Sequence, residues 1–172
     1  MLIDFAILAF TETKGFSQDV EHPMKDVFQP AILNEILSRI ETLTPTTQRL
    51  WGKMDVAQMM AHCSEVLKVA VGDEKPPRAF IGKIIGGFMK PILRNEKPFA
   101  KNSPTDPIFK IIKVKNFTNE KAVLIGLLKR FAVGGETNVT THPHPFFGKL
   151  TPAEWSSATY KHLNHHLQQF GC

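Results

Sequence analysis

Cysteine is scarce in this chain of 172 residues, which has only Cys63 and Cys172. Two cysteines provide neither a disulfide framework nor a Cys-x-x-Cys motif for a metal or redox centre. This scarcity fits a reducing compartment, and we expect the protein to be cytoplasmic. Cys63 falls on an apolar helical pattern, so the default interpretation is a buried and unreactive thiol.

Dense runs of basic residues with interleaved aromatic residues are also missing, although the formal charge is +5. The lysines and arginines are spread out, apart from a concentration around residues 75–115 that acids and prolines interrupt. Nucleic-acid surfaces carry a more continuous basic stripe. We therefore expect no nucleic-acid partner and interpret the charge as a solvated basic surface.

The apolar stretch at the N-terminus is too short to span a membrane. Leu2–Phe10 also contains Asp4, and it lacks both a basic region before it and a small-residue cleavage site after it, so it does not qualify as a signal peptide. Met24 is a candidate alternative start, which makes residues 1–23 an N-terminal extension outside the native domain. We place the domain at residues 24–172 and expect no membrane partner.

Helical periodicity is the feature that the sequence does contain. The length suits one domain, and apolar residues recur at intervals of three and four over residues 29–43, 55–71 and 118–132. In the third of these helices the residues expected to point inward are Val123, Leu124, Leu127, Leu128 and Phe131. Thr151–Glu154 begins a fourth helix with a capping box and proline at the first helical position.

Residues 73–117 lack a continuous helical pattern, because prolines and glycines interrupt them repeatedly. Residues 80–93 are compatible with a short apolar helix, and residues 97–107 must be irregular. A connection this long usually crosses the body of a domain or lines a site. Four principal helices, one long connection and few strand-like alternations predict an all-α fold, a four-helix bundle.

Three of the seven histidines lie in the last helix. His162 and His166 are one turn apart and point from the same side, so two neutral imidazoles could hold one divalent cation if a third ligand joined them. His165 falls nearly opposite the apolar face and is expected to be solvated. The motif is weak, so there is an alternative: a solvent-exposed helix end at which the histidines interact favourably with the helix dipole.

A third histidine could come from the second helix. His62 lies at the margin of the apolar stripe of residues 55–71. Taken alone, such a residue is more often a packed, hydrogen-bonded side chain than a ligand. Bundles, however, build metal sites from side chains on facing helices, which makes His62, His162 and His166 a candidate triad.

Four sequence motifs in this order resemble one family. They are LWGKM (50–54), AQMMAH (57–62), HPHPFFGKLT (142–151) and KHLNHHLQQFG (161–171). Together they resemble the DinB/YfiT-like superfamily of metalloproteins, in a branch of unknown function, over residues 24–171. The resemblance implies an up-down-down-up four-helix bundle with its long crossover at residues 73–117. Asn164 departs from the family pattern, where aspartate is expected, and this puts a salt bridge in doubt more than the site.

The same resemblance implies a metal site formed by His62, His162 and His166. Zinc and nickel are the first candidates, with iron as an alternative, because imidazole discriminates weakly among them. A small-molecule substrate, a homodimer, and hydrolysis or thiol transfer are compatible with the family. The alternatives are a non-catalytic bundle with a structural or adventitious cation and a basic interaction module without metal.

No residue is identified as a general base. The candidates for contacts around the metal or the substrate are His142, His144, Glu65 and Gln58. The two histidines lie in a proline-rich turn (142–148), where packing is the preferred interpretation and a ligand or substrate contact the alternative.

Overall fold

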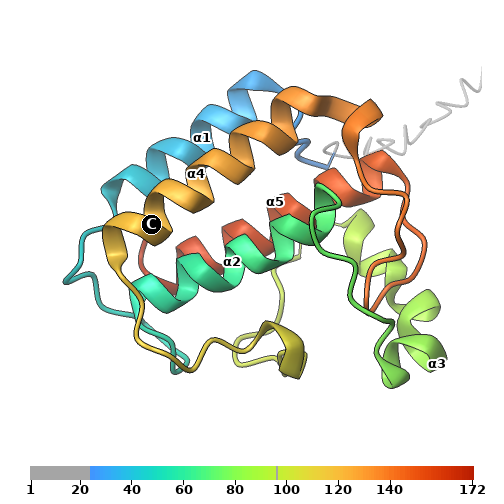
Figure 1. The fold of residues 1–172 in the computed structure, drawn as a ribbon, viewed down its shortest axis with the longest axis horizontal. Helices are drawn as coiled ribbons and strands as arrows, with labels where there is room; N and C mark the ends of the chain where they lie inside the picture. Colours follow the sequence, from blue (N-terminus) through green and yellow to red (C-terminus); the bar gives the residue numbers. More distant parts are fainter. Residues whose placement is uncertain (1–23, 96) are drawn as a thin grey trace, which may run out of the picture.

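The computed structural model describes residues 24–95 and 97–172 (Figure 1). In chain order its helices are α1 (Pro30–Thr42), α2 (Val56–Ala70), α3 (Phe80–Met89), η1 (Lys90–Arg94), η2 (Pro107–Phe109), α4 (Phe117–Gly134), η3 (Gly135–Asn138) and α5 (Pro152–Gln169). This part of the chain contains no β-strand, only an isolated bridge between His144 and Gly148. The predicted all-α class is confirmed, whereas the expected extension at residues 1–23 lies outside the described residues.

Local sequence signals fix where the helices begin. Asp55 and Gln58 form a capping box on α2, and Thr151 and Glu154 form another on α5. Each box satisfies backbone N–H groups that have no partner within the helix. Helix α4 begins one residue before the predicted start at 118, and its cap is the side chain of Asn116.

Four of the α-helices surround the core. Both α1 and α2 pack against α4 and α5 (Figure 1). Their largest fully buried side chains are Ile36, Ile40, Met59, Met60, Leu67, Leu124, Leu128, Trp155, Leu163 and Leu167. One inward prediction was wrong: Val123 is 44% exposed, because α4 turns Leu124, Leu127 and Leu128 toward its neighbours and leaves Val123 on their flank.

Helix α3 stands apart from this body. Among the named elements it packs only against η1, and Figure 1 shows it to one side of the other helices. It is attached through Gly82 and Gly86, which lie directly against the backbone of residues 145–147. None of the described helices is both long and apolar enough to cross a membrane.

Replacement of Gly86 by alanine tests this attachment. A Cβ at this position would collide with the carbonyl oxygen of Phe146, whereas a Cβ on Gly87 would meet no atom within 4 Å. We expect Gly86→Ala to destabilise the protein by about 1–3 kcal/mol through overpacking. Gly87→Ala should instead stabilise α3 by roughly 0.5–1 kcal/mol through helix propensity. Urea denaturation of both variants measures the difference, and equal effects would contradict the contact.

Candidate metal centre

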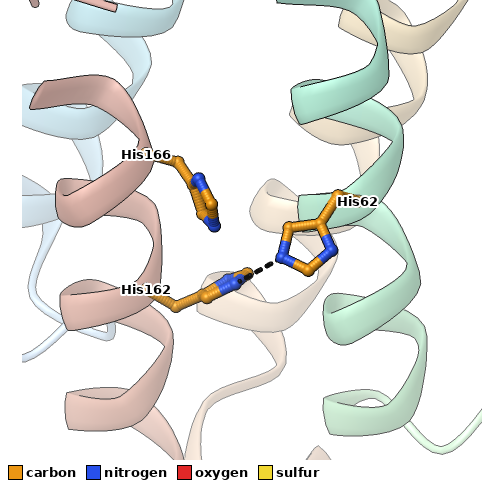
Figure 2. A group of neighbouring side chains, drawn as sticks. All are labelled: His62, His162 and His166. Atoms are coloured by element: carbon orange, nitrogen blue, oxygen red, sulfur yellow. Dashed lines mark hydrogen bonds between the residues drawn. The ribbon is translucent and has the colours of Figure 1, made fainter. Parts of the chain in front are cut away.

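Three histidine side chains meet between α2 and α5. His62 comes from the middle of α2, and His162 and His166 come from successive turns of α5 (Figure 2). One nitrogen from each ring lies within 4.8 Å of the others. The structure therefore brings together all three predicted residues, although His62 and His162 are 100 positions apart in the sequence.

The geometry of the cluster suits a small cation. The Nε2 atoms of His62 and His162 are 3.0 Å apart, and a tetrahedral zinc ion with Zn–N bonds of about 2.0–2.1 Å would place two ligand nitrogens roughly 3.3 Å apart. Among the described residues the cluster contains imidazole alone, which is a donor set typical of zinc, nickel, copper and iron. The three residues therefore fit a divalent metal ion.

Two of the three rings are oriented by hydrogen bonds on the opposite nitrogen. The Nδ1 of His62 donates to the carbonyl oxygen of Phe109 at 2.9 Å. The Nδ1 of His166 lies 2.8 Å from the side-chain oxygen of Gln169, which can only accept. In the neutral rings these bonds place the proton on Nδ1 and leave the Nε2 lone pair free, the arrangement that metal-binding histidines normally have.

The tautomer of His162 follows from that of His62. With its Nδ1 proton donated to Phe109, His62 offers only a lone pair at Nε2. The 3.0 Å contact then requires His162 to donate from Nε2. Ligation through this same nitrogen would need the proton on Nδ1 instead, so His162 is the ring whose proton must move when a cation binds.

Burial keeps the cluster neutral. It lowers the pKa of His166 to about 3, an effect that the neighbouring His62 reinforces and the Gln169 hydrogen bond opposes. Burial also lowers the pKa of His62, against the raising effect of the Phe109 carbonyl. The pKa of His162 lies well below its usual range because of burial and the adjacent His166. Since metals bind the neutral ring, no side chain of the triad has to lose a charge before ligation at neutral pH.

The position of His165 differs from the sequence prediction. It is half-buried instead of solvated, because Trp51 and Phe99 cover it, with ring centroids 5.8 and 6.1 Å away. Helical arithmetic places a residue relative to its own helix and does not register side chains that arrive from loops. His165 is outside the triad but contacts His166, with 5.1 Å between ring centroids.

The long connection after α3 lines the site, which is one of the two roles that we expected for it. It supplies Phe99 to the ring of His165 and, from η2, the carbonyl of Phe109 to His62. Lys101 in the same segment lies over the ring of Trp51, 4.5 Å from its centroid. These contacts place an aromatic cover beside the histidines.

The other candidate residues lie outside the cluster. Gln58 belongs to the capping box of α2, and Glu65 pairs with Lys68 at 2.7 Å. The Nε2 of His142 bonds to the carbonyl oxygen of Pro76 at 2.9 Å. The Nδ1 of His144 accepts from the backbone N–H groups of residues 146 and 147. His144 thus stabilises its own turn and His142 connects that turn to Pro76, which agrees with the packing interpretation.

Two supporting groups were missed in the sequence. Gln169 is buried, and besides contacting His166 its side-chain nitrogen donates to the carbonyl oxygen of Trp51 at 2.8 Å. Its position three residues after His166 could have identified it, because side chains at i and i+3 meet on a helix. The carbonyl of Phe109 carries no such signal, since every residue has one.

Glycine at position 52 makes room for Gln169. Gly52 has φ +82°, and a Cβ there would collide with the side-chain nitrogen of Gln169. The turn after Trp51 can therefore approach the end of α5 closely enough for its carbonyl to accept from Gln169. This contact joins LWG (50–52) to the C-terminal motif in the folded chain.

Cys63, the neighbour of His62, takes no part in the cluster. It is buried, and burial raises the pKa of its thiol far above the usual range. A thiol that stays protonated is neither a good nucleophile nor a good ligand. The prediction of an unreactive core cysteine agrees with this environment.

Comparison with protein-family models gives one finding. The family described as Protein of unknown function (DUF1569) matches residues 24–171, a range that includes every α-helix above and all three clustered histidines. No curated protein and no solved structure matches the chain.

Proposed function

We propose that this chain, which belongs to the DUF1569 family of proteins of unknown function, is a DinB-like metal-binding protein. In this proposal His62, His162 and His166 together hold one divalent cation. The observation that carries it is the convergence of three imidazoles whose Nδ1 atoms are, in two cases, already occupied by acceptors. A packed histidine needs one hydrogen-bond partner, but it does not need two further imidazoles at its other nitrogen.

The arrangement of the helices supports the DinB-like part of the proposal. In Figure 1, α1 and α5 run in one direction and α2 and α4 in the other. The connection between α2 and α4 is the long one, and it contains α3. An up-down-down-up bundle with a crossover between its second and third helices has these same properties.

Zinc is the first candidate for the cation and nickel the second. Three neutral imidazoles leave the full charge of the ion uncompensated, and three protein ligands with one open position are typical of catalytic zinc. When bound, such an ion lowers the pKa of a coordinated water toward neutrality or holds a thiol as the thiolate. We therefore propose small-molecule hydrolysis or thiol transfer as the reaction class.

The residues around the triad support this use of the site. Phe109 and Gln169 hold two of the rings in place, and Trp51, Phe99 and His165 form an aromatic cluster next to them. Such a cluster would limit access of bulk water to an open coordination position. A structural cation would instead need a fourth protein ligand, and the cluster found in the described residues has three.

Titration of zinc into chelator-treated protein tests the proposed function. The expected result is a single saturable site with one ion per chain. Binding at several weak sites would indicate adventitious capture by surface histidines and contradict the proposal. For the reaction class, the metal-loaded protein should turn over an activated ester or transfer a thiol cosubstrate, and loss of that activity in His162→Ala would link it to the site.

Replacement of Gln169 by alanine tests the support of the triad. Without the Gln169 oxygen, His166 loses the acceptor that orients its ring and fixes its tautomer. We expect the zinc affinity to fall about 10- to 100-fold, as for other residues that orient metal ligands. The matched control is Gln168→Ala, because Gln168 is exposed and contacts Asn164 at 3.5 Å. Equal affinities for the two variants in a competition titration would show that Gln169 is not a positioning residue.

A further inference from the structure

The outer side of α3 is an exposed apolar stripe, which we call the α3 stripe and define as Phe80, Ile81, Ile84 and Phe88. Their exposed fractions are 80, 58, 58 and 86%. Isolated exposed apolar residues are common in proteins, but a contiguous group of large ones marks an interaction surface. The α3 stripe is such a group, and both of its phenylalanine side chains are almost fully exposed to solvent.

The backbone of α3 explains why these residues face outward. Gly82 and Gly86 are one turn apart, and both are buried against the backbone of residues 145–147. Phe80, Ile84 and Phe88 are also spaced by one turn, and on the helical wheel they lie opposite the two glycines. The attachment through glycine thus fixes which side of α3 is presented.

The charged residues of the segment that carries the stripe are all basic. Between Lys75 and Asn95 the sequence has no aspartate or glutamate, but it has Arg78, Lys83, Lys90 and Arg94. Lys83 is exposed on the flank of the stripe, and Lys75 is exposed just before the helix. Lys90 lies 3.6 Å from the carboxylate of Glu154. A partner for this surface should be both apolar and negatively charged.

We propose that α3 is an interfacial helix that docks the protein on an anionic membrane surface. Helices that lie in the plane of a membrane bury an apolar side in the headgroup region while flanking lysines reach the anionic lipids. A second copy of the chain is a poorer occupant, because a two-fold contact would bring the same uncompensated cations together. This proposal replaces the sequence-based expectation of no membrane partner, which rested on the absence of a spanning segment.

Vesicle flotation of the full chain tests the proposal. The probe is an equal mixture of phosphatidylserine and phosphatidylcholine, compared with phosphatidylcholine alone. We expect the protein to float with the mixed vesicles and to bind the neutral ones less. For the double variant Phe80→Asp/Phe88→Asp we expect the affinity for the mixed vesicles to fall at least about tenfold. Two aromatic side chains no longer enter the apolar region, and two acids face anionic headgroups.

Val133→Asp is the matched control, because Val133 is 83% exposed on α4, a helix that does not pack against α3. It should float as the wild type does, and circular dichroism should show all variants folded. No flotation of the wild type, or equal flotation of the double variant, would overturn the proposal. Light scattering measures the oligomeric state. If the wild type is a dimer that does not float, and the double variant is a monomer, the stripe is a self-association surface and the membrane proposal is overturned.

Discussion

Replacement of His162 by alanine should lower the zinc affinity by roughly two to three orders of magnitude. Complete zinc sites contribute about 10–16 kcal/mol, so one of three protein ligands accounts for several kcal/mol. The Nε2 atom of His162 also lies 3.0 Å from that of His62. Its loss leaves two nitrogens, which hold a divalent ion only weakly. Competition with a chromophoric chelator measures the change.

His165→Ala is the matched control for this variant. His165 is in the same helix, is half-buried and contacts His166 through its ring, so its replacement also removes packing around the triad. We expect His165→Ala to keep its affinity within a few-fold of the wild type. If the two variants lose the same amount of affinity, packing around α5 and not ligation by His162 controls the metal.

Acidification should destabilise the metal-free protein between pH 6.5 and about pH 4.5. Burial lowers the pKa of His166 from 6.5 to about 3, so in this interval the unfolded chain binds a proton at His166 that the folded chain does not. The free energy of unfolding then rises with pH and falls as pH is lowered, by about 1.4 kcal/mol per pH unit for each such histidine. His166 alone contributes a loss of roughly 2–3 kcal/mol over this range.

Urea denaturation of chelator-treated protein across this interval measures the effect. Carboxylates titrate mostly below it, so the histidines dominate. His62, His162 and His144 also have lowered pKa values and act in the same direction. The variant His166→Gln cannot take up a proton at this position. Its free energy of unfolding should therefore change less steeply with pH, by the equivalent of one proton. A stability that does not change with pH, or an identical slope in the variant, would show that His166 is not buried in its neutral form.

Much of the fold follows from short-range patterns. The capping box at Thr151 predicts where α5 begins, and the apolar periodicity predicts the extent of α2, because both effects act within one or two helical turns. The placement of α3 does not follow from them. Its glycines at 82 and 86 suggest a weak helix in the sequence, whereas in the structure they are the points of closest contact with residues 145–147.

The candidate site divides in the same way. The relation of His162 to His166 is set by one turn of helix and is therefore predictable. His62 was proposed because bundles build metal sites on facing helices, and the resemblance to a family implied the same residue. The partial burial of His165 and the Phe109 hydrogen bond depend on how the crossover lies against α2 and α5. Long loops are not specified by local periodicity, so these contacts required the structure.

The most direct test of the account is the metal content of the full chain purified without a polyhistidine tag. Elemental analysis by inductively coupled plasma mass spectrometry should find about one equivalent of a transition metal per chain, zinc first and nickel second. The same preparation of His162→Ala should contain almost none. A wild type with a small fraction of an equivalent, or a variant with the same content as the wild type, would contradict the assignment of His62, His162 and His166 as a metal site.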